Sequence, residues 1–257
     1  MTDNLSGHDV RFGRIVRTVG YLLMAQTAAS VDHFVANSTY VKARIAKYYG
    51  RDASVIHPPV DLERFGPLPG PRGDFYVTLS ALVPYKRVDL AVAAFNQMGK
   101  RLVVIGGGNQ EAGLRRAAGA SVDIRGHVAA TEVVELLGSC RALIMPGIED
   151  FGIGVVEALA SGAPVIALGE GGVRDTVRGM GDGVGEPTGM FFSDPTVPAL
   201  CEAAERFEQV TFDPALVAAS AQRFSRQQFL EGMRSEIDEV LSTWPSRRDG
   251  TRAVQRV

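Results

Sequence analysis

The hydrophobic pattern of the chain alternates between two periods. Short runs of consecutive apolar residues, typical of strands buried on both faces, alternate with stretches whose apolar positions recur at helical spacing. The predicted strands are residues 32–37, 53–59, 74–82, 100–106, 121–126, 141–147 and 188–192, and the predicted helices are 39–50, 87–99, 109–119 and 130–140, with one more helix and strand inside 147–167. Strands separated by helices of this length predict right-handed βαβ units. The expected fold class is therefore α/β, with a doubly wound parallel sheet.

The alternation is interrupted once. Residues 61–73 are rich in Pro and Gly and show little periodicity, which predicts a linker. The chain is thereby divided into a short α/β segment (1–60), the linker, a main domain (74–223) and a C-terminal segment (224–257). The first part of that last segment, residues 224–244, has the pattern of a long amphipathic helix, and its basic end is expected to fray.

Composition narrows the class of protein. With 46% hydrophobic and 22% charged residues the chain is globular rather than disordered, and a net charge of −2 gives no overall reason to bind nucleic acid. Cys140 and Cys201 match no metal-ligand spacing and are expected to be reduced, packed thiols of a cytosolic protein. No apolar run is long enough to span a membrane, and the first residues lack the apolar core of a secretory signal.

Candidate chemistry is expected after the strands, because doubly wound sheets bind ligands at the carboxyl ends of their strands. The segment GIEDFGIGVVEALASGAPVIA (147–167) places Glu149 and Glu157 eight positions apart across a helix start at Phe151 and Gly152. A wholly helical step would separate the carboxylates by about 12 Å, the scale of a nucleoside diphosphate sugar, with helix amides facing the diphosphate between them. Alternatively, Glu149 is a helix-dipole partner and Glu157 a solvated residue. The spacing alone leaves both interpretations open.

Three further loops follow strands. Lys86 and Arg87 open a helix and are able to neutralise a departing diphosphate, although an ordinary basic loop has the same sequence signature. The glycines of 106–109 lack the full dinucleotide fingerprint, so a tight turn explains them equally well and a nicotinamide-dependent enzyme is disfavoured. The segment GEGGVRD (169–175) offers backbone amides to a phosphate, with a plain glycine turn as the alternative.

Together these segments carry a resemblance. EDFGIGVVEALASGAPVIA, with VPYKR upstream and GEGGVRDTV and PTGMFF downstream, resembles the nucleotide-sugar domain of glycosyltransferase family 4, whose members are retaining enzymes with the two-domain GT-B fold. SALVPYKRVDLAVAAFN, VDHFVANSTYVKARIAKYYG and VIHPPVD are similar to mannosyltransferases that build bacterial polysaccharides. The resemblance covers about residues 30–230.

The resemblance implies roles for individual residues. Glu157 would hold the ribose hydroxyls and Glu149 the hydroxyls of the donor sugar, while the backbone at Phe151 and Gly152 would lie beside the sugar and phosphate. Lys86 would contact the diphosphate. The implied reaction moves mannose from GDP-mannose, or another nucleotide sugar, to a polysaccharide or lipid-linked acceptor. No cofactor is implied, and the absence of a D-x-D triplet fits the usual independence of a metal ion in this family.

The chain departs from the family pattern in two ways. Many members have an arginine where this chain has Ala81, and Arg87 is the candidate to replace it in binding the donor. GT-B enzymes also have two Rossmann-like domains, of which residues 1–60 would be a remnant of the acceptor domain, with His33 and His57 in structural roles. The apolar stretch 19–29 is then expected to be mobile, aggregation-prone or paired with a missing domain or companion chain.

Two hypotheses follow. The first is a glycosyltransferase whose chain is shortened, acting in the cytoplasm with at most peripheral contact with the inner face of the membrane. The second is a non-catalytic module that keeps the nucleotide-sugar site but places no acceptor.

Overall fold

The computed structural model describes residues 27–183 and 185–251, with side chains up to residue 243. The chain forms two compact units, of which the larger is His57–Ser235. The smaller consists of the residues before His57 and after Ser235. Most of the apolar stretch 19–29, on which the prediction of an uncovered face rests, lies outside the described residues.

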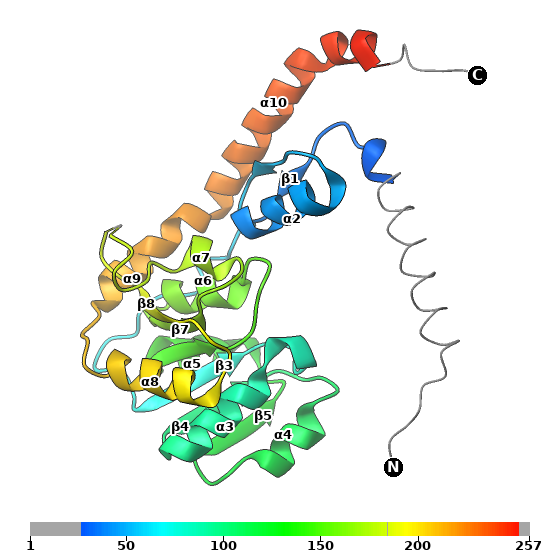
Figure 1. Cartoon of the computed structure of the whole chain (residues 1–257). Coiled ribbons are helices and arrows are strands. Elements are labelled where there is room, and N and C mark those ends of the chain that lie inside the picture. Colours follow the sequence, from blue (N-terminus) through cyan, green and yellow to red (C-terminus); the bar gives the residue numbers. More distant parts are fainter. Residues whose placement is uncertain (1–26, 184, 252–257) are drawn as a thin grey trace, which may run out of the picture. The chain divides into compact units, whose positions relative to one another are not determined.

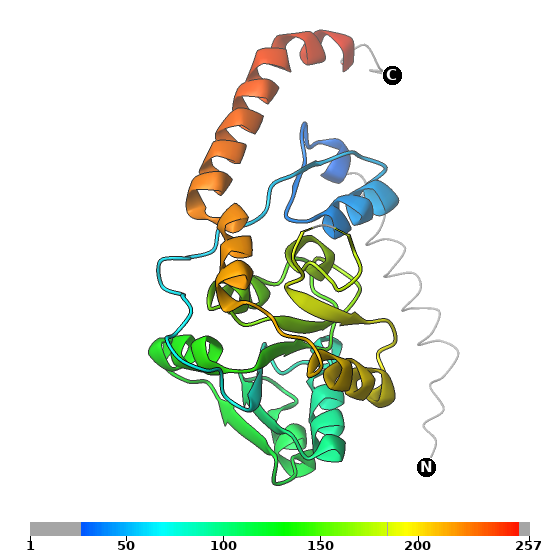
Figure 2. The ribbon, with the colours of Figure 1, turned by 90° about the vertical axis from the view of Figure 1, so that its left-hand side faces the viewer.

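The larger unit is built on a six-stranded parallel sheet with helices on both faces (Figure 1, Figure 2). Its strands are β3 (Phe75–Leu79), β4 (Arg101–Ile105), β5 (Val122–Gly126), β6 (Ala142–Met145), β7 (Val165–Leu168) and β8 (Gly189–Phe192). Their order in the sheet is β5-β4-β3-β6-β7-β8. The chain therefore builds outward from β3 in one direction and returns to β6 on its other side. The β3–β6 boundary is the topological switch point, where such sheets open a crevice.

Nearly every strand is followed by a helix. The helices of the larger unit are α3 (Val88–Met98), α4 (Glu111–Ala117), α5 (Ala130–Ser139), α6 (Ile153–Ala160), α7 (Val173–Thr176), α8 (Val197–Phe207) and α9 (Pro214–Ser220), with two 3₁₀ turns, η1 (Pro84–Lys86) and η2 (Ala221–Phe224), and the first residues of α10 (Arg226–Thr251). No helix in the described ranges is long and apolar enough to cross a membrane.

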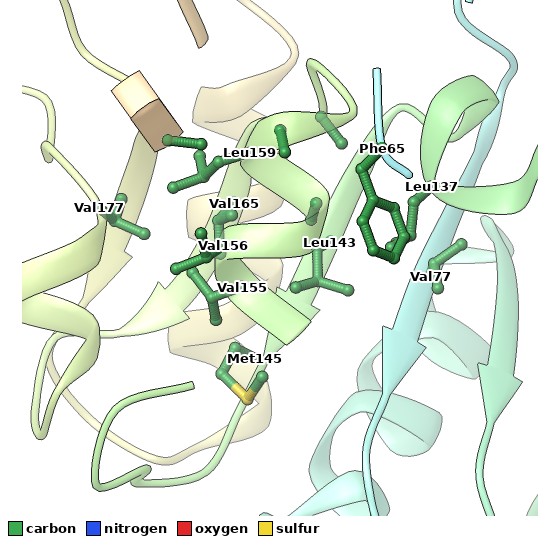
Figure 3. Packing of buried hydrophobic residues seen from close by; sticks show 14 of the residues in the cluster. Phe65, Val77, Leu137, Leu143, Met145, Val155, Val156, Leu159, Val165 and Val177 are labelled. Atoms are coloured by element: carbon green, nitrogen blue, oxygen red, sulfur yellow. The ribbon is translucent and has the colours of Figure 1, made fainter. Parts of the chain in front are cut away.

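Two hydrophobic cores lie on the two faces of the sheet. Along β6, Leu143 and Met145 contribute to the core formed with α5, α6 and α9, whereas Ala142 and Ile144 contribute to the core formed with α3, α4 and α8. This alternation follows from the two-residue period of a strand, and burial on both faces explains the uninterrupted apolar runs in the sequence. Figure 3 shows the first core, in which Val155, Val156 and Leu159 of α6 are labelled together with strand residues.

Arg72 ties the segment before the sheet to two helix ends. Its Nε donates to the carbonyl of Cys140 (2.5 Å), Nη2 to that of Leu137 (2.6 Å) and Nη1 to that of Ser161 (3.1 Å). These carbonyls belong to the last turns of α5 and α6, where carbonyl groups lack backbone N–H donors and carry partial negative charge. One guanidinium therefore caps both helices. Phe65, also from residues 61–73, is buried in the same core as Leu137 (Figure 3).

The smaller unit contains two short parallel strands, β1 (Val35–Ala36) and β2 (Ser54–Val55), joined by α2 (Thr39–Tyr49). Ser38 caps the start of α2 by accepting a hydrogen bond from the amide of Val41, and Gly50 ends it at φ 61°. His33 and Ser54 both contact the Glu236 carboxylate of α10, at 2.5 Å each.

The structure confirms every strand that the sequence predicts, usually with shorter bounds. Hydrophobic periodicity missed α7, α8 and α9, although Thr196 and Asp213 are N-caps of α8 and α9 and a proline follows each of them within two residues. The terminal helix is longer than expected and continues to Thr251.

Cys140 and Cys201 are free and buried, and burial raises the pKa of the Cys140 thiol to about 11.

Replacing Arg72 by Ala should lower the free energy of unfolding by ~3 kcal/mol, because it leaves three helix-terminal carbonyls without a charged donor. Arg101→Ala is the matched control. It removes an exposed ion pair with Asp74 and should cost less than about 1 kcal/mol. Urea unfolding of both variants followed by circular dichroism measures the two values, and equal values would contradict the capping role.

Candidate nucleotide-sugar site

The loops that leave β3 and β6 meet at the switch point of the sheet. The 3₁₀ turn after β3 carries Lys86, the loop after β6 carries Glu149, and their side chains form an ion pair. The side chains are 12% and 15% exposed, respectively. The Lys86 ammonium also lies 4.9 Å from the ring centroid of Tyr85, a residue that the sequence analysis did not single out. Two predicted site residues 63 positions apart are thus in direct contact.

Gly147 allows these two loops to approach each other. A Cβ atom at Gly147 would lie 2.6 Å from the carbonyl oxygens of both Tyr85 and Lys86, closer than side-chain atoms can pack. The glycine therefore sets how near the β6 loop comes to the β3 turn. Its position directly after an apolar strand is the sequence signal for such an approach.

Glycines of the β7 loop hold Glu149 from the other side. The amide of Gly172 donates to the carbonyl of Glu149 (2.7 Å), and Glu149 forms an isolated bridge with Gly171. A Cβ at Gly172 would lie 2.2 Å from the carbonyl oxygen of Asp150. The idea that this segment presents its amides to a phosphate is therefore wrong for Gly172, whose amide is used to fix the neighbouring loop.

The glycines after β4 also serve close packing. A Cβ at Gly106 would meet the Ser80 carbonyl oxygen at 1.9 Å, and one at Gly108 would meet the Leu82 carbonyl oxygen at 2.3 Å. The amide of Leu82 donates to the carbonyl of Gly107 at 3.0 Å. The tight-turn interpretation of this loop accounts for these contacts.

Helix α6 begins later than the sequence analysis expected. Gly152 is its N-cap, at φ 90°, and the first helical residue is Ile153. Glu149 therefore lies in the loop, and the step from Glu149 to Glu157 is not wholly helical. Because the bridge to Gly171 places Glu149 beside the loop after β7, the helical estimate of the carboxylate separation does not apply. The amides of Ile153 and Gly154 have no acceptor among the described residues, as is usual for a first helical turn.

The Phe151 side chain is buried under the site. Its ring stacks on His57, with centroids 5.5 Å apart, and meets Phe224 edge to face at the same distance. This packing anchors the loop between Glu149 and α6 to the core. It agrees with a structural role for His57, and it leaves only the backbone of Phe151 and Gly152 for contact with a ligand.

Glu157 is the half-buried carboxylate of α6. Its side chain has no hydrogen-bond or ion-pair partner among the residues that the structure describes. Burial raises the pKa of this carboxyl, and the nearby charge of Arg64 only partly opposes the rise in pKa. A carboxylate held without a partner next to Val155, Val156 and Ala158 is costly, so the solvated interpretation of Glu157 does not describe its surroundings.

Arg87 differs from the other predicted site residues. It is the one non-glycine residue of the described ranges with a positive φ, 53°, where the 3₁₀ turn gives way to α3. Its side chain is 38% exposed, and its Nε lies 3.3 Å from Oδ1 of Asp89. Contact between Arg87 and a donor therefore stays a prediction.

No group of three or more His, Cys, Asp or Glu side chains in the described part of the chain is arranged to hold a metal ion.

The model of the family described as glycosyl transferases group 1 matches residues 60–222, more than half of the chain. The chain belongs to this family. The match contains the whole six-stranded sheet and all the site loops, so the Lys86–Glu149 contact lies within the part of the chain that the family model matches.

Relatives and solved structures agree with the assignment. Over 203 residues the chain is 32% identical to a GDP-mannose-dependent alpha-(1-6)-phosphatidylinositol monomannoside mannosyltransferase of Mycobacterium tuberculosis, covering 67% of this chain and 52% of the relative. It is 29% identical to a D-inositol 3-phosphate glycosyltransferase of Kineococcus radiotolerans, covering 79% and 54%. The chain thus spans about half the length of these curated relatives.

Two solved structures share the fold. They are a sucrose-phosphate synthase of Thermosynechococcus elongatus (TM-score 0.69, 19% identity, covering 87% of this chain and 62% of the other) and the Anabaena protein HepE in complex with UDP and glucose (TM-score 0.66, 21% identity, covering 83% and 63%). The sheet and its flanking helices are therefore those of the GT-B glycosyltransferases.

Glu157→Gln should make the protein more stable at pH 7. Because the folded-state pKa of Glu157 is raised, the charged carboxylate costs stability above that pKa, and the cost disappears as the pH falls and the group is protonated. Urea unfolding should therefore show a gain for Glu157→Gln at pH 7 that shrinks toward pH 4. Glu63→Gln, at an exposed position, should show no such trend. A Glu157→Gln gain that is independent of pH would contradict the burial argument.

Proposed function

We propose that this chain is the donor half of a retaining family 4 glycosyltransferase of the mannosyltransferase subgroup. It binds GDP-mannose and delivers mannose to a polysaccharide or lipid-linked acceptor. The proposal rests on the ion pair between Lys86 and Glu149 at the switch point. The next helix, α6, adds the carboxylate of Glu157, which has no partner among the described residues. The name of the M. tuberculosis relative supports GDP-mannose as the donor and a lipid-linked acceptor.

Each group has a role in binding the donor. The Glu157 carboxylate accepts hydrogen bonds from the two ribose hydroxyls, which supply the donors that it lacks in the free protein. The first amides of α6 and the Lys86 ammonium receive the diphosphate. Glu149 accepts hydrogen bonds from the sugar hydroxyls. The Arg87 guanidinium leaves Asp89 and contacts the diphosphate as a second cation.

The proposed chemistry is departure of the diphosphate from the anomeric carbon and attack by the acceptor hydroxyl on the same face. An oxocarbenium-like ion pair forms between these events, and the leaving diphosphate oxygen takes the proton of the acceptor. The chain holds the donor in place and stabilises the charge on the leaving group through Lys86. An acceptor domain completes the enzyme in this proposal, in keeping with relatives of which the matched part of this chain covers about half.

Glu157→Ala should weaken the binding of GDP by about 2 kcal/mol, roughly thirtyfold in Kd, because the ribose hydroxyls lose a charged acceptor. Calorimetric titration of the full chain with GDP measures the change, and Glu63→Ala serves as the control. An unchanged Kd for Glu157→Ala, or no binding of GDP, GDP-mannose, UDP or UDP-glucose by the folded wild type, would refute the proposed site.

Lys86→Ala should weaken the binding of GDP more than that of guanosine, because only GDP offers a diphosphate to the ammonium. The control is Lys100→Ala, which removes a lysine next to the opposite, amino end of β4, where it pairs with Glu208. An equal loss for GDP and guanosine would remove the assigned phosphate role of Lys86.

A further inference from the structure

We infer that the Lys86–Glu149 ion pair makes the site prefer a nucleotide that carries a sugar over the same nucleoside diphosphate without one. Glu149 is then a specificity-determining residue as well as a sugar contact, because it competes with a bare diphosphate for Lys86. This inference rests on the proposed nucleotide-sugar site and adds to it a means of releasing the product.

The ion pair is shielded and its two halves are fixed. The side chains of Lys86 and Glu149 are 12% and 15% exposed. The backbone carbonyl of Lys86 is packed on Gly147, and Glu149 is bridged to Gly171 and accepts from the amide of Gly172. Neither loop can withdraw to solvent without breaking these contacts. The carboxylate and the ammonium therefore stay in the site whether or not they are paired.

A bare diphosphate must take Lys86 away from Glu149. The Glu149 carboxylate then remains in a shielded site without its cation and next to a new anion. Removing one partner of a buried pair is costly because the other charge is left uncompensated. Among the described residues, Lys86 is the cation that Glu149 contacts, whereas Arg87, the nearest arginine in sequence to Lys86, contacts Asp89 and not Glu149. No other basic side chain in direct contact takes over the compensation.

A nucleotide sugar avoids this cost. Its sugar hydroxyls are hydrogen-bond donors, so they supply Glu149 with new partners at the same time as the diphosphate takes Lys86. Both charges are compensated again, by two parts of one ligand. After the sugar has been transferred, Glu149 loses its hydroxyl partners and competes once more for Lys86. The ion pair that closes the free site thereby favours departure of the nucleoside diphosphate.

The test compares the affinities of the full chain for GDP and GDP-mannose in the wild type and in Glu149→Gln. UDP and UDP-glucose form the second probe pair, and the pair that the wild type binds is used. Glu149→Gln should bind the bare diphosphate about tenfold more tightly than the wild type, since Lys86 is released from its competitor. The ratio of the two Kd values, bare diphosphate over nucleotide sugar, should fall by at least the same factor.

Two controls separate the ion pair from a general effect of charge. Glu170→Gln removes a negative charge from an exposed position of the adjoining β7 loop and should change the affinity for the bare diphosphate less than about twofold. In the Lys86→Ala background the gain from Glu149→Gln should vanish, because the competition has already been removed.

Equal or weaker binding of the bare diphosphate by Glu149→Gln would overturn the inference, as would an equal gain in Glu170→Gln or in the Lys86→Ala background. If Glu157→Ala still loses affinity in those cases, the nucleotide site stands and only the competition is refuted. Absence of binding by the wild type for all four probes refutes the site and the inference together.

Discussion

The site depends on backbone packed directly against backbone at the carboxyl ends of the strands. Where the loops after β3, β6 and β7 meet, Gly147 and Gly172 leave no space for even one methyl group. A Cβ atom at either position would clash with the facing backbone and force the loops apart. The close approach of the loops is therefore part of what brings Lys86 and Glu149 together as a shielded pair. The parallel strands bring the loops to the same edge of the sheet, and the glycines allow the loops to approach each other closely.

Fixing α6 in place has an energetic cost, which is the partial burial of one charged side chain on that helix. The helix is fixed to the core through Val155, Val156 and Leu159, and the same anchoring holds Glu157 half-buried and without a partner. A helix free to rotate would expose that carboxylate. The large apolar contact of α6 offsets the desolvation of one charged group, so the helix can hold an unfavourable side chain in a fixed place.

Much of the fold could be predicted because a strand buried on both faces leaves an unbroken apolar run, as β6 does. The short helix α7 has no such signal, since four residues are too few to show a period. Glu149, Glu157 and Lys86 could be selected from their positions after strands. Their contacts could not, because the contact between residues 86 and 149 depends on which strands are neighbours. The role of Gly172 was misjudged for the same reason, as its acceptor lies on a different loop.

Arg72 has a consequence for the order in which the chain acquires its structure. Its carbonyl acceptors lie as many as 65 and 89 residues further along the chain, in Leu137 and Ser161. During synthesis the guanidinium emerges from the ribosome long before either helix end exists. The end of α5 can be secured once residue 140 has been made, but both helix ends are secured together only after residue 161 has been made, which places this closure late in co-translational folding of the larger unit.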